Sequence, residues 1–212
     1  MSLKNKKILI TSGPTWVPLD PVRVISNRST GELGKLLTKA CQKAGGKVTL
    51  LEGPVQEPLK SSSVRIRKFC FFDELKKLLK EELKKSYDVV IHAAAVADYR
   101  LEKPLQEKIG SYRETWQLTL IPTEKLILKI KRLSPKSFLV GFKLETTATK
   151  DQLFRVSRGL MESAHCDLVV ANSFQGGYHA YLLGEDEDVI LGQAKSRPEL
   201  VQKLIKTLTS AL

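Results

Sequence analysis

Three strings within residues 7–51 decide the fold: KILITSGP at 7–14, LGKLLTKACQKAGG at 33–46 and VTLL at 48–51. The first is a short β-branched run ended by Gly13 and Pro14, which is typical of a buried strand followed by a loop. In the second, leucine and alanine recur at helical spacing until Gly45 and Gly46 end the helix. The third is another short apolar run. The stretch therefore predicts a strand, a long loop, a helix and a second strand.

The same alternation continues along the chain. Strands are predicted at residues 64–69, 88–92, 138–142 and 167–171, and helices at 73–85, 124–132, 151–164 and from a capping box at Ser196 to the last residue. This order predicts a mainly parallel sheet, because parallel strands need helical crossovers. The expected fold class is α/β, a Rossmann-like three-layer sandwich, in a single domain over residues 1–212.

Two regions depart from the alternation. Residues 99–121 contain Pro104 and Gly110 and then alternate over 115–120, which predicts a flap followed by an extra strand. Residues 178–191 predict a small β-hairpin extension around Gly184.

The composition indicates a globular protein of the cytoplasm. Hydrophobic residues make up 42% and charged residues 27%, which is close to average usage. The longest apolar stretches fall far short of the roughly 20 residues that span a bilayer, and no targeting segment is visible. Cys41, Cys70 and Cys166 have no CxxC spacing, so neither a disulfide framework nor a zinc site is indicated. We expect no membrane partner and a reducing compartment.

The net charge of +12 does not by itself indicate a nucleic-acid-binding protein. Over residues 73–86, five lysines alternate with four acids at helical ion-pair spacings, which is typical of the solvated face of a helix. No nucleic-acid-binding motif accompanies the charge. We therefore expect no nucleic-acid partner.

Unusual residues follow four of the predicted strands, at the edge where parallel sheets bind ligands. They are Ser12-Gly13-Pro14-Thr15 with residues 26–34, residues 93–99, Gly141-Phe142-Lys143, and Asn172. Small residues at a strand-to-helix junction let backbone amides approach an anion. Ser29, Thr30 and Gly31, with Gly34 one turn on, supply that arrangement.

Spacing alone leaves a second interpretation of this junction equally open. Ser29 and Glu32 also match an ordinary capping box, which needs no ligand. Residues 93–95 can likewise be explained by tight packing of small side chains, and Asp98 by an ordinary acidic residue on the surface. The loop before the helix is long, however, and ordering such a loop usually serves a function.

An NAD(P)-dependent reductase is the alternative function. Glu52 ends the second strand, where an acid binds a ribose in dinucleotide enzymes, but the first loop lacks the GxGxxG pattern. Tyr99 and Lys103 have the Tyr-x-x-x-Lys spacing of short-chain dehydrogenases, yet Pro104 argues against the helix that this motif needs. The three histidines are scattered, and neither metal ligands nor a covalent nucleophile is indicated.

Five strings, in their order and spacing over about residues 7–175, resemble phosphopantothenoylcysteine synthetase. They are ITSGPTWVPLDPVRVISNRSTGELG at 10–34, HAAAVADYR at 92–100, EKI at 107–109, VGFKLET at 140–146 and DLVVAN at 167–172. Each string alone is weak evidence for the family, whereas five strings in the same order are highly specific for it. The resemblance implies a ligase of coenzyme A biosynthesis that joins L-cysteine to 4'-phosphopantothenate. It also implies an acyl-nucleotide intermediate made from CTP or ATP, with Mg²⁺ and release of pyrophosphate.

The resemblance also assigns roles to residues of this chain. Asn27 matches the asparagine that contacts the acyl intermediate, and Lys108 matches a lysine of a mobile flap over the phosphates; both are expected to be catalytic. Nucleotide contacts fall on Gly13, Ser29, Thr30, Gly31, Gly34, Asp98, Lys108, Phe142 and Asn172. Substrate contacts fall on Asn27, Ala94, Ala95 and Asp98. No residue is expected to bind a metal directly.

This sequence also departs from the family pattern. Bacterial bifunctional members continue the flap as Lys-Ile-Lys-Lys, whereas Lys108-Ile109 is followed here by Gly110-Ser111. Lysines are also missing before the sixth strand, where Lys143, Arg155 or Arg158 are candidates to replace their charge. The segment after Phe142 resembles the ATP-using eukaryotic enzyme, while residues 18–27 resemble the bacterial, CTP-using one, and we expect CTP. The family further implies a homodimer. In many bacteria this domain is fused behind a flavin-binding decarboxylase domain, so a separate flavin-dependent decarboxylase is a candidate partner and no flavin is expected in this chain.

Overall fold

A computed structural model describes residues 2–103, 105–110, 112, 114–186 and 189–212. Its centre is an eight-stranded sheet in the order β12-β11-β10-β9-β6-β1-β4-β5. The strands are β1 (Lys7–Ser12), β4 (Lys47–Glu52), β5 (Arg65–Lys68), β6 (Val89–His92), β9 (Phe138–Glu145), β10 (Leu168–Ser173), β11 (His179–Leu183) and β12 (Ile190–Ala194). The six strands from β5 to β10 are parallel, while β11 and β12 are antiparallel. The predicted parallel sheet and its hairpin extension are both confirmed.

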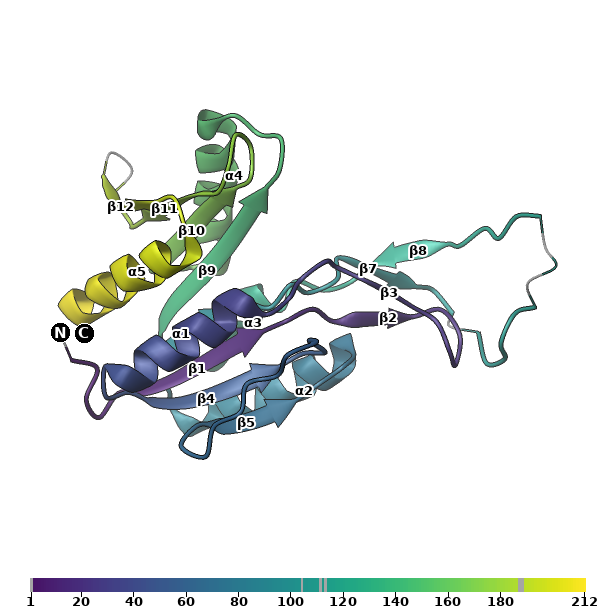
Figure 1. The fold of residues 1–212 in the computed structure, drawn as a ribbon, viewed down its shortest axis with the longest axis horizontal. Helices are drawn as coiled ribbons and strands as arrows, with labels where there is room; N and C mark the ends of the chain where they lie inside the picture. Colours follow the sequence, from purple (N-terminus) through teal and green to yellow (C-terminus); the bar gives the residue numbers. More distant parts are fainter. Residues whose placement is uncertain (1, 104, 111, 113, 187–188) are drawn as a thin grey trace.

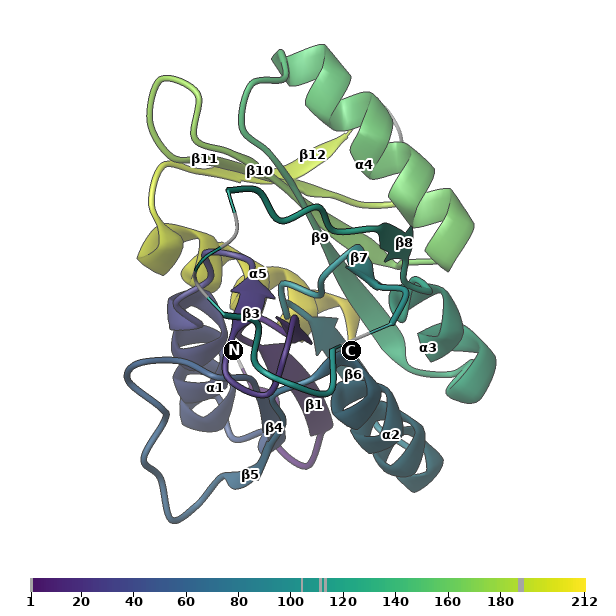
Figure 2. The ribbon, with the colours of Figure 1, turned by 90° about the vertical axis from the view of Figure 1, so that its right-hand side faces the viewer.

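Helices cover both faces of the sheet, so the molecule has three layers (Figures 1 and 2). The helices α1 (Glu32–Lys43) and α5 (Arg197–Ala211) lie on one face, and α2 (Phe72–Glu82), α3 (Ile127–Leu133) and α4 (Lys150–Ala164) on the other. Successive residues of β1 alternate between the two cores, because side chains of a strand point to opposite faces. Ile8 belongs to the first core and Leu9 to the second. The predicted three-layer sandwich is confirmed.

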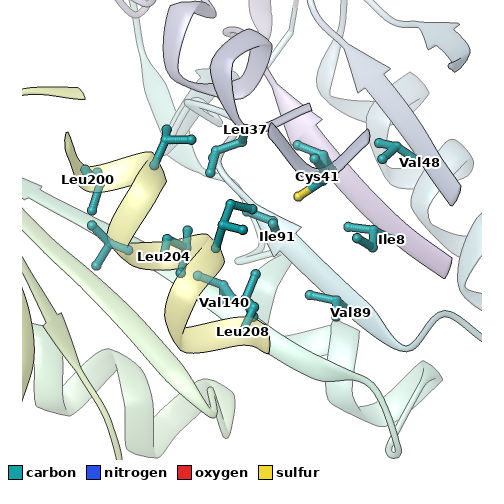
Figure 3. Packing of buried hydrophobic residues seen from close by; sticks show 14 of the residues in the cluster. Ile8, Leu37, Cys41, Val48, Val89, Ile91, Val140, Leu200, Leu204 and Leu208 are labelled. Carbon is teal, nitrogen blue, oxygen red and sulfur yellow. The ribbon is translucent and has the colours of Figure 1, made fainter. Parts of the chain in front are cut away.

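Figure 3 shows the first core, where α1 and α5 pack on the sheet. Leu37 and Cys41 from α1 and Leu204 from α5 are completely buried, and they face Ile8 and other apolar residues of the sheet. Burial raises the pKa of the Cys41 thiol to about 12. Cys41 is therefore an inert apolar core residue, as the sequence indicated.

Two antiparallel ribbons project from the body as one arm (Figure 1). The first pairs β2 (Trp16–Pro18) with β3 (Val24–Ser26), and the second pairs β7 (Tyr99–Leu101) with β8 (Leu120–Pro122). Arg23 joins them, since its guanidinium donates to the carbonyl oxygen of Ile109 at 2.9 Å and lies 4.5 Å from the ring centroid of Trp116. We define these two ribbons, with residues 19–23 and the described residues of 102–119, as the arm.

The structure corrects several predicted boundaries. The loop over residues 13–34 contains the β2–β3 ribbon, and the strand predicted at 115–120 begins only at Leu120. The helix predicted at 73–85 ends as α2 at Glu82 and continues as a 3₁₀ turn, η1 (Leu83–Lys85). Ser196 caps α5 as predicted, because its hydroxyl accepts the N–H of Glu199. Over the described residues, no helix is both long and apolar enough to cross a membrane.

Candidate active site

A cleft of about 1080 Å³ opens at the edge of the sheet where β1, β6, β9 and β10 end. Parallel strands end at the same edge, so residues far apart in sequence meet there. The cleft is lined by Asn27, Ser29, Thr30, Gly31, Gly34, Ala94, Ala95, Asp98, Phe142 and Asn172. These are all of the predicted site residues except Gly13 and Lys108.

The helix α1 begins at the cleft with a glycine as its N-cap residue. Gly31 has a φ of 71°, in the left-handed region that favours glycine, and it has no side chain with which to cap the helix. Oγ1 of Thr30 accepts the N–H of Glu32, the first residue of α1, at 3.4 Å. The capping box of Ser29 with Glu32 is therefore wrong, because Glu32 instead pairs with Arg197 at 2.8 Å. Leu33 and Gly34, the next residues of the first turn, line the cleft, and their N–H groups have no acceptor among the described residues, which is the arrangement that binds an anion.

Gly13 has a structural role instead of a position in the cleft. It is buried, its φ is 80°, and a Cβ there would lie 3.0 Å from Cγ1 of Val55 and 3.2 Å from the backbone of Gly53. The tight turn after β1 therefore requires glycine. The predicted nucleotide contact of Gly13 stays a prediction.

Backbone N–H groups of the segment after β6 bond to β1 and to the loop after it. Ala94 N–H donates to Oγ1 of Thr11 at 3.1 Å, and Ala95 N–H donates to the carbonyl oxygen of Gly13 at 2.9 Å. Ala97 N–H donates to Oγ1 of Thr15 at 2.8 Å. These bonds fix the alanine segment as one wall of the cleft.

Asn27 joins the segment before α1 to this wall. Its side-chain Nδ2 donates to the carbonyl oxygens of Ala95 and Val96, at 3.2 and 3.3 Å. Both amide hydrogens are used by these two bonds. An oxyanion in the cleft would have to compete with them for the same donors.

His92 lines the cleft as a neutral, mostly buried side chain. Burial lowers its pKa to about 4, and its Nδ1 lies 3.0 Å from Oγ1 of Thr11. Because Thr11 Oγ1 already accepts Ala94 N–H, its own hydrogen can be donated to Nδ1 of His92. This favours the tautomer with the proton on Nε2. From the sequence, this position could be recognised only as a polar residue at the end of a strand.

Next to Asn172, which was predicted, the cleft contains residues that the sequence did not indicate. Asn172 Oδ1 is buried and has no hydrogen-bond partner in the described part of the chain. Phe174, Tyr178 and Arg197 line the cleft beside it. The last two lie in a hairpin and at the start of a helix, where nothing in the local pattern points to a ligand.

Charged side chains in the cleft are mostly paired. Lys125 pairs with Asp98, and Lys143 pairs with Glu145 at 2.9 Å. Among the residues expected to replace missing lysines, Lys143 lines the cleft, whereas Arg155 and Arg158 do not. Nη2 of Arg158 donates to the carbonyl oxygen of Asp186 at 3.0 Å, which ties it to the hairpin.

Lys108 is not brought to the cleft. It is exposed on the arm, in the segment between β7 and β8, and Gly110 follows it there. Ser111, the other altered flap residue, lies outside the described residues. The catalytic role of Lys108 stays a prediction.

The residues that favoured a reductase are placed elsewhere. Glu52 is buried outside the cleft, where its Oε1 accepts the N–H of Leu59 at 2.8 Å. Tyr99 lies on β7 and not on a helix. Neither residue is positioned to bind a dinucleotide in the cleft.

Comparisons with known proteins point to one family. A family model described as the DNA/pantothenate metabolism flavoprotein C-terminal domain matches residues 3–211. The chain is 35% identical over 206 residues to the coenzyme A biosynthesis bifunctional protein CoaBC of Thermococcus kodakarensis, covering 95% of this chain and 49% of that protein. It is 34% identical over 173 residues to CoaBC of Vibrio cholerae, covering 80% of this chain and 42% of that protein.

A solved structure has the same fold. It is the DNA/pantothenate metabolism flavoprotein from Streptococcus pneumoniae, which is 28% identical, with a TM-score of 0.87 over 98% of this chain and 100% of that chain. The chain spans about half the length of the curated relatives it matches.

Proposed function

This chain belongs to the family of DNA/pantothenate metabolism flavoprotein C-terminal domains, and on that premise we propose that it is a phosphopantothenate–cysteine ligase. It would join L-cysteine to 4'-phosphopantothenate in coenzyme A biosynthesis. The observation that carries the proposal is the cleft, in which the α1 N-terminus faces the alanine wall after β6. One end is suited to phosphate and the other to an acyl group.

The chemistry would proceed in two steps. The carboxylate oxygen of phosphopantothenate attacks the α-phosphorus of the nucleotide, and pyrophosphate leaves. The amine of cysteine then attacks the acyl carbon, loses a proton, and displaces the nucleoside monophosphate. Neither step needs a nucleophile from the protein, so its contribution is to position the reactants and to stabilise charge.

Residues of the cleft would divide this work. Backbone N–H groups of Gly31 and the first turn of α1, with the hydroxyls of Ser29 and Thr30, would hold the phosphates. Ala94, Ala95 and Asp98 would hold phosphopantothenate. Asn27 would stabilise the oxyanion after exchanging one of its bonds to the alanine wall.

Mg²⁺ would enter as the complex with the nucleotide. Among the described residues, no group of three or more His, Cys, Asp or Glu side chains could hold a metal ion. Magnesium commonly binds through phosphates, waters and only one or two carboxylates, and Asp98 and Glu32 line the cleft. When bound, the ion would neutralise charge on the departing pyrophosphate.

Pyrophosphate release tests the function directly. With MgCTP, release should require phosphopantothenate, and CMP should appear only after L-cysteine is added. The same assay with MgATP decides the nucleotide, for which we propose CTP. Absence of turnover with both nucleotides would refute the ligase.

We also propose a homodimer formed through the arm. Val22, Val24, Ile25, Tyr99 and Leu120 expose apolar side chains on the two ribbons. A projecting surface of this kind is typical of protein–protein contacts. In light scattering, Ile25→Glu should shift a dimer toward monomer, while the same change at Val156, an exposed position on α4 outside the arm, should not. A wild-type monomer would refute the dimer.

Two further proposals concern the setting of the enzyme. We propose that it acts in the cytoplasm, together with a separate flavin-dependent decarboxylase that uses its product.

Lys108 would act on the phosphates only if the arm, or the arm of a second copy, reaches the cleft. Lys108→Gln should then lower the rate of pyrophosphate release without changing stability.

A further inference from the structure

Arg197 and Glu32 form an ion pair across the mouth of the cleft. Arg197 is the first residue of α5 and Glu32 is the first residue of α1. Nη1 of Arg197 donates to Oε2 of Glu32 at 2.8 Å, and both side chains are partly open to solvent. The pair thus places a guanidinium beside the N-terminus of α1.

An aromatic pair supports the guanidinium. Its central carbon lies 5.8 Å from the ring centroid of Phe174 and 5.7 Å from that of Tyr178, and the two rings are 5.6 Å apart. All of these residues line the cleft. Aromatic faces attract a guanidinium, so the rings would keep Arg197 in place if it exchanged its acidic partner.

The negative charge of Glu32 opposes phosphate binding, and the positive charge of Arg197 can offset it. A carboxylate at the first residue of α1 would repel phosphates at that helix end, although it suits the helix dipole. The bond to Glu32 uses one of the five N–H groups of the guanidinium, and its planar fork matches two phosphate oxygens at once. Lys125 and Lys143, which also line the cleft, are compact point charges paired with other acids.

We propose that Arg197 binds the triphosphate of the nucleotide directly, with Glu32 as its partner in the empty cleft and Phe174 and Tyr178 as its support. This rests on the proposed function, because it assigns a phosphate contact within the same cleft.

Calorimetric titration of the full chain tests the proposal without requiring turnover. The ligands are MgCTP, MgATP and inorganic tripolyphosphate, and the variants are Arg197→Gln, Glu32→Gln and the double variant. Loss of a charge-assisted contact should weaken both the preferred nucleotide and tripolyphosphate about tenfold to a hundredfold in Arg197→Gln. The double variant should be weaker than Glu32→Gln by a similar factor. Lys206→Gln, an exposed charge change on the same helix, should bind like wild type.

Two outcomes would overturn the assignment of Arg197 to the triphosphate while leaving the proposed ligase intact. If the double variant binds as well as Glu32→Gln, Arg197 only neutralises Glu32. If nucleotides weaken but tripolyphosphate does not, Arg197 contacts the base or ribose. If wild type binds tripolyphosphate through Arg197 but neither nucleotide, Arg197 contacts polyphosphate as inferred, while the nucleotide contact and with it the proposed ligase are refuted. Binding of no ligand by a folded wild type refutes both, and thermal melts of each variant establish that it is folded.

Discussion

Gly34 on α1 and Ser12 at the end of β1 are packed so closely that a side chain on the glycine has no space. A Cβ at position 34 would lie 2.1 Å from Oγ and 2.3 Å from Cβ of Ser12. Ser12 Oγ in turn donates to the carbonyl oxygen of Gly31 at 3.2 Å. The strand end therefore fixes the position of the helix N-terminus that we propose binds phosphate.

Gly34→Ala should destabilise the fold and weaken nucleotide binding, because overpacking a tight contact costs about 1–3 kcal/mol. Adding Ser12→Gly should restore much of the stability, since the nearest remaining atom, Cα of residue 12, is 3.3 Å away. Urea denaturation measures both effects. Gly159→Ala on α4 is the control: that position has open space around it, so alanine should add about 0.5–1 kcal/mol by helix propensity. Equal effects at positions 34 and 159 would contradict the packing argument.

Asn27→Asp should release pyrophosphate but form little phosphopantothenoylcysteine. A carboxylate cannot donate to the carbonyl oxygens of Ala95 and Val96, and it would repel a developing oxyanion. Loss of one such donor slows the second step about a hundredfold or more. Single-turnover experiments that follow pyrophosphate and product separately measure this ratio. Product that keeps pace with pyrophosphate would remove Asn27 from the second step.

The order of elements and most of the cleft could be predicted because they depend on local pattern and on one rule of topology. Apolar runs and helical spacing predicted the parallel strands, and parallel strands bring Ala94, Phe142 and Asn172 to one edge. The three-residue strands of the arm are too short to show an alternation. The junction at Ser29 was ambiguous because the residue types fit both interpretations. The backbone angle of Gly31, which the sequence does not show, makes this glycine the N-cap residue of α1 in place of Ser29.

Arg197 could not be predicted as part of the cleft. Its contact with Glu32 joins residues 165 positions apart, and it depends on how α5 crosses the sheet after two antiparallel strands. No periodic pattern in the sequence indicates a contact between residues so far apart along the chain. Lys108 shows the opposite case, because its motif matched while the structure places it on the arm, away from the cleft.

Glu82→Gln should cost much more stability than Glu81→Gln. Glu82 is completely buried; burial raises its pKa, but hydrogen bonds from Lys85, Tyr87 and Arg67 outweigh that effect and lower the pKa to about 2. Breaking such a buried network costs about 3–5 kcal/mol, whereas a partly exposed pair such as Glu81 with Arg67 contributes about 1 kcal/mol or less. Denaturant melts at pH 7 compare the two. Because the folded pKa is depressed, the stabilisation should be present above about pH 4.5 and lost as the pH falls toward 2.

His92 should make the protein less stable in mild acid. Its pKa is about 4 in the fold, against an ordinary value of 6.5, so between these values the unfolded chain binds a proton that the folded chain does not. Stability should therefore fall as the pH drops from 6.5 toward 4, by about 2 kcal/mol between pH 7 and pH 5. His92→Gln does not titrate and can still meet Thr11, so its stability should change less over the same range. Urea melts of wild type and variant at both pH values measure the difference. If wild type and variant lose equal stability, His92 is not a buried neutral group.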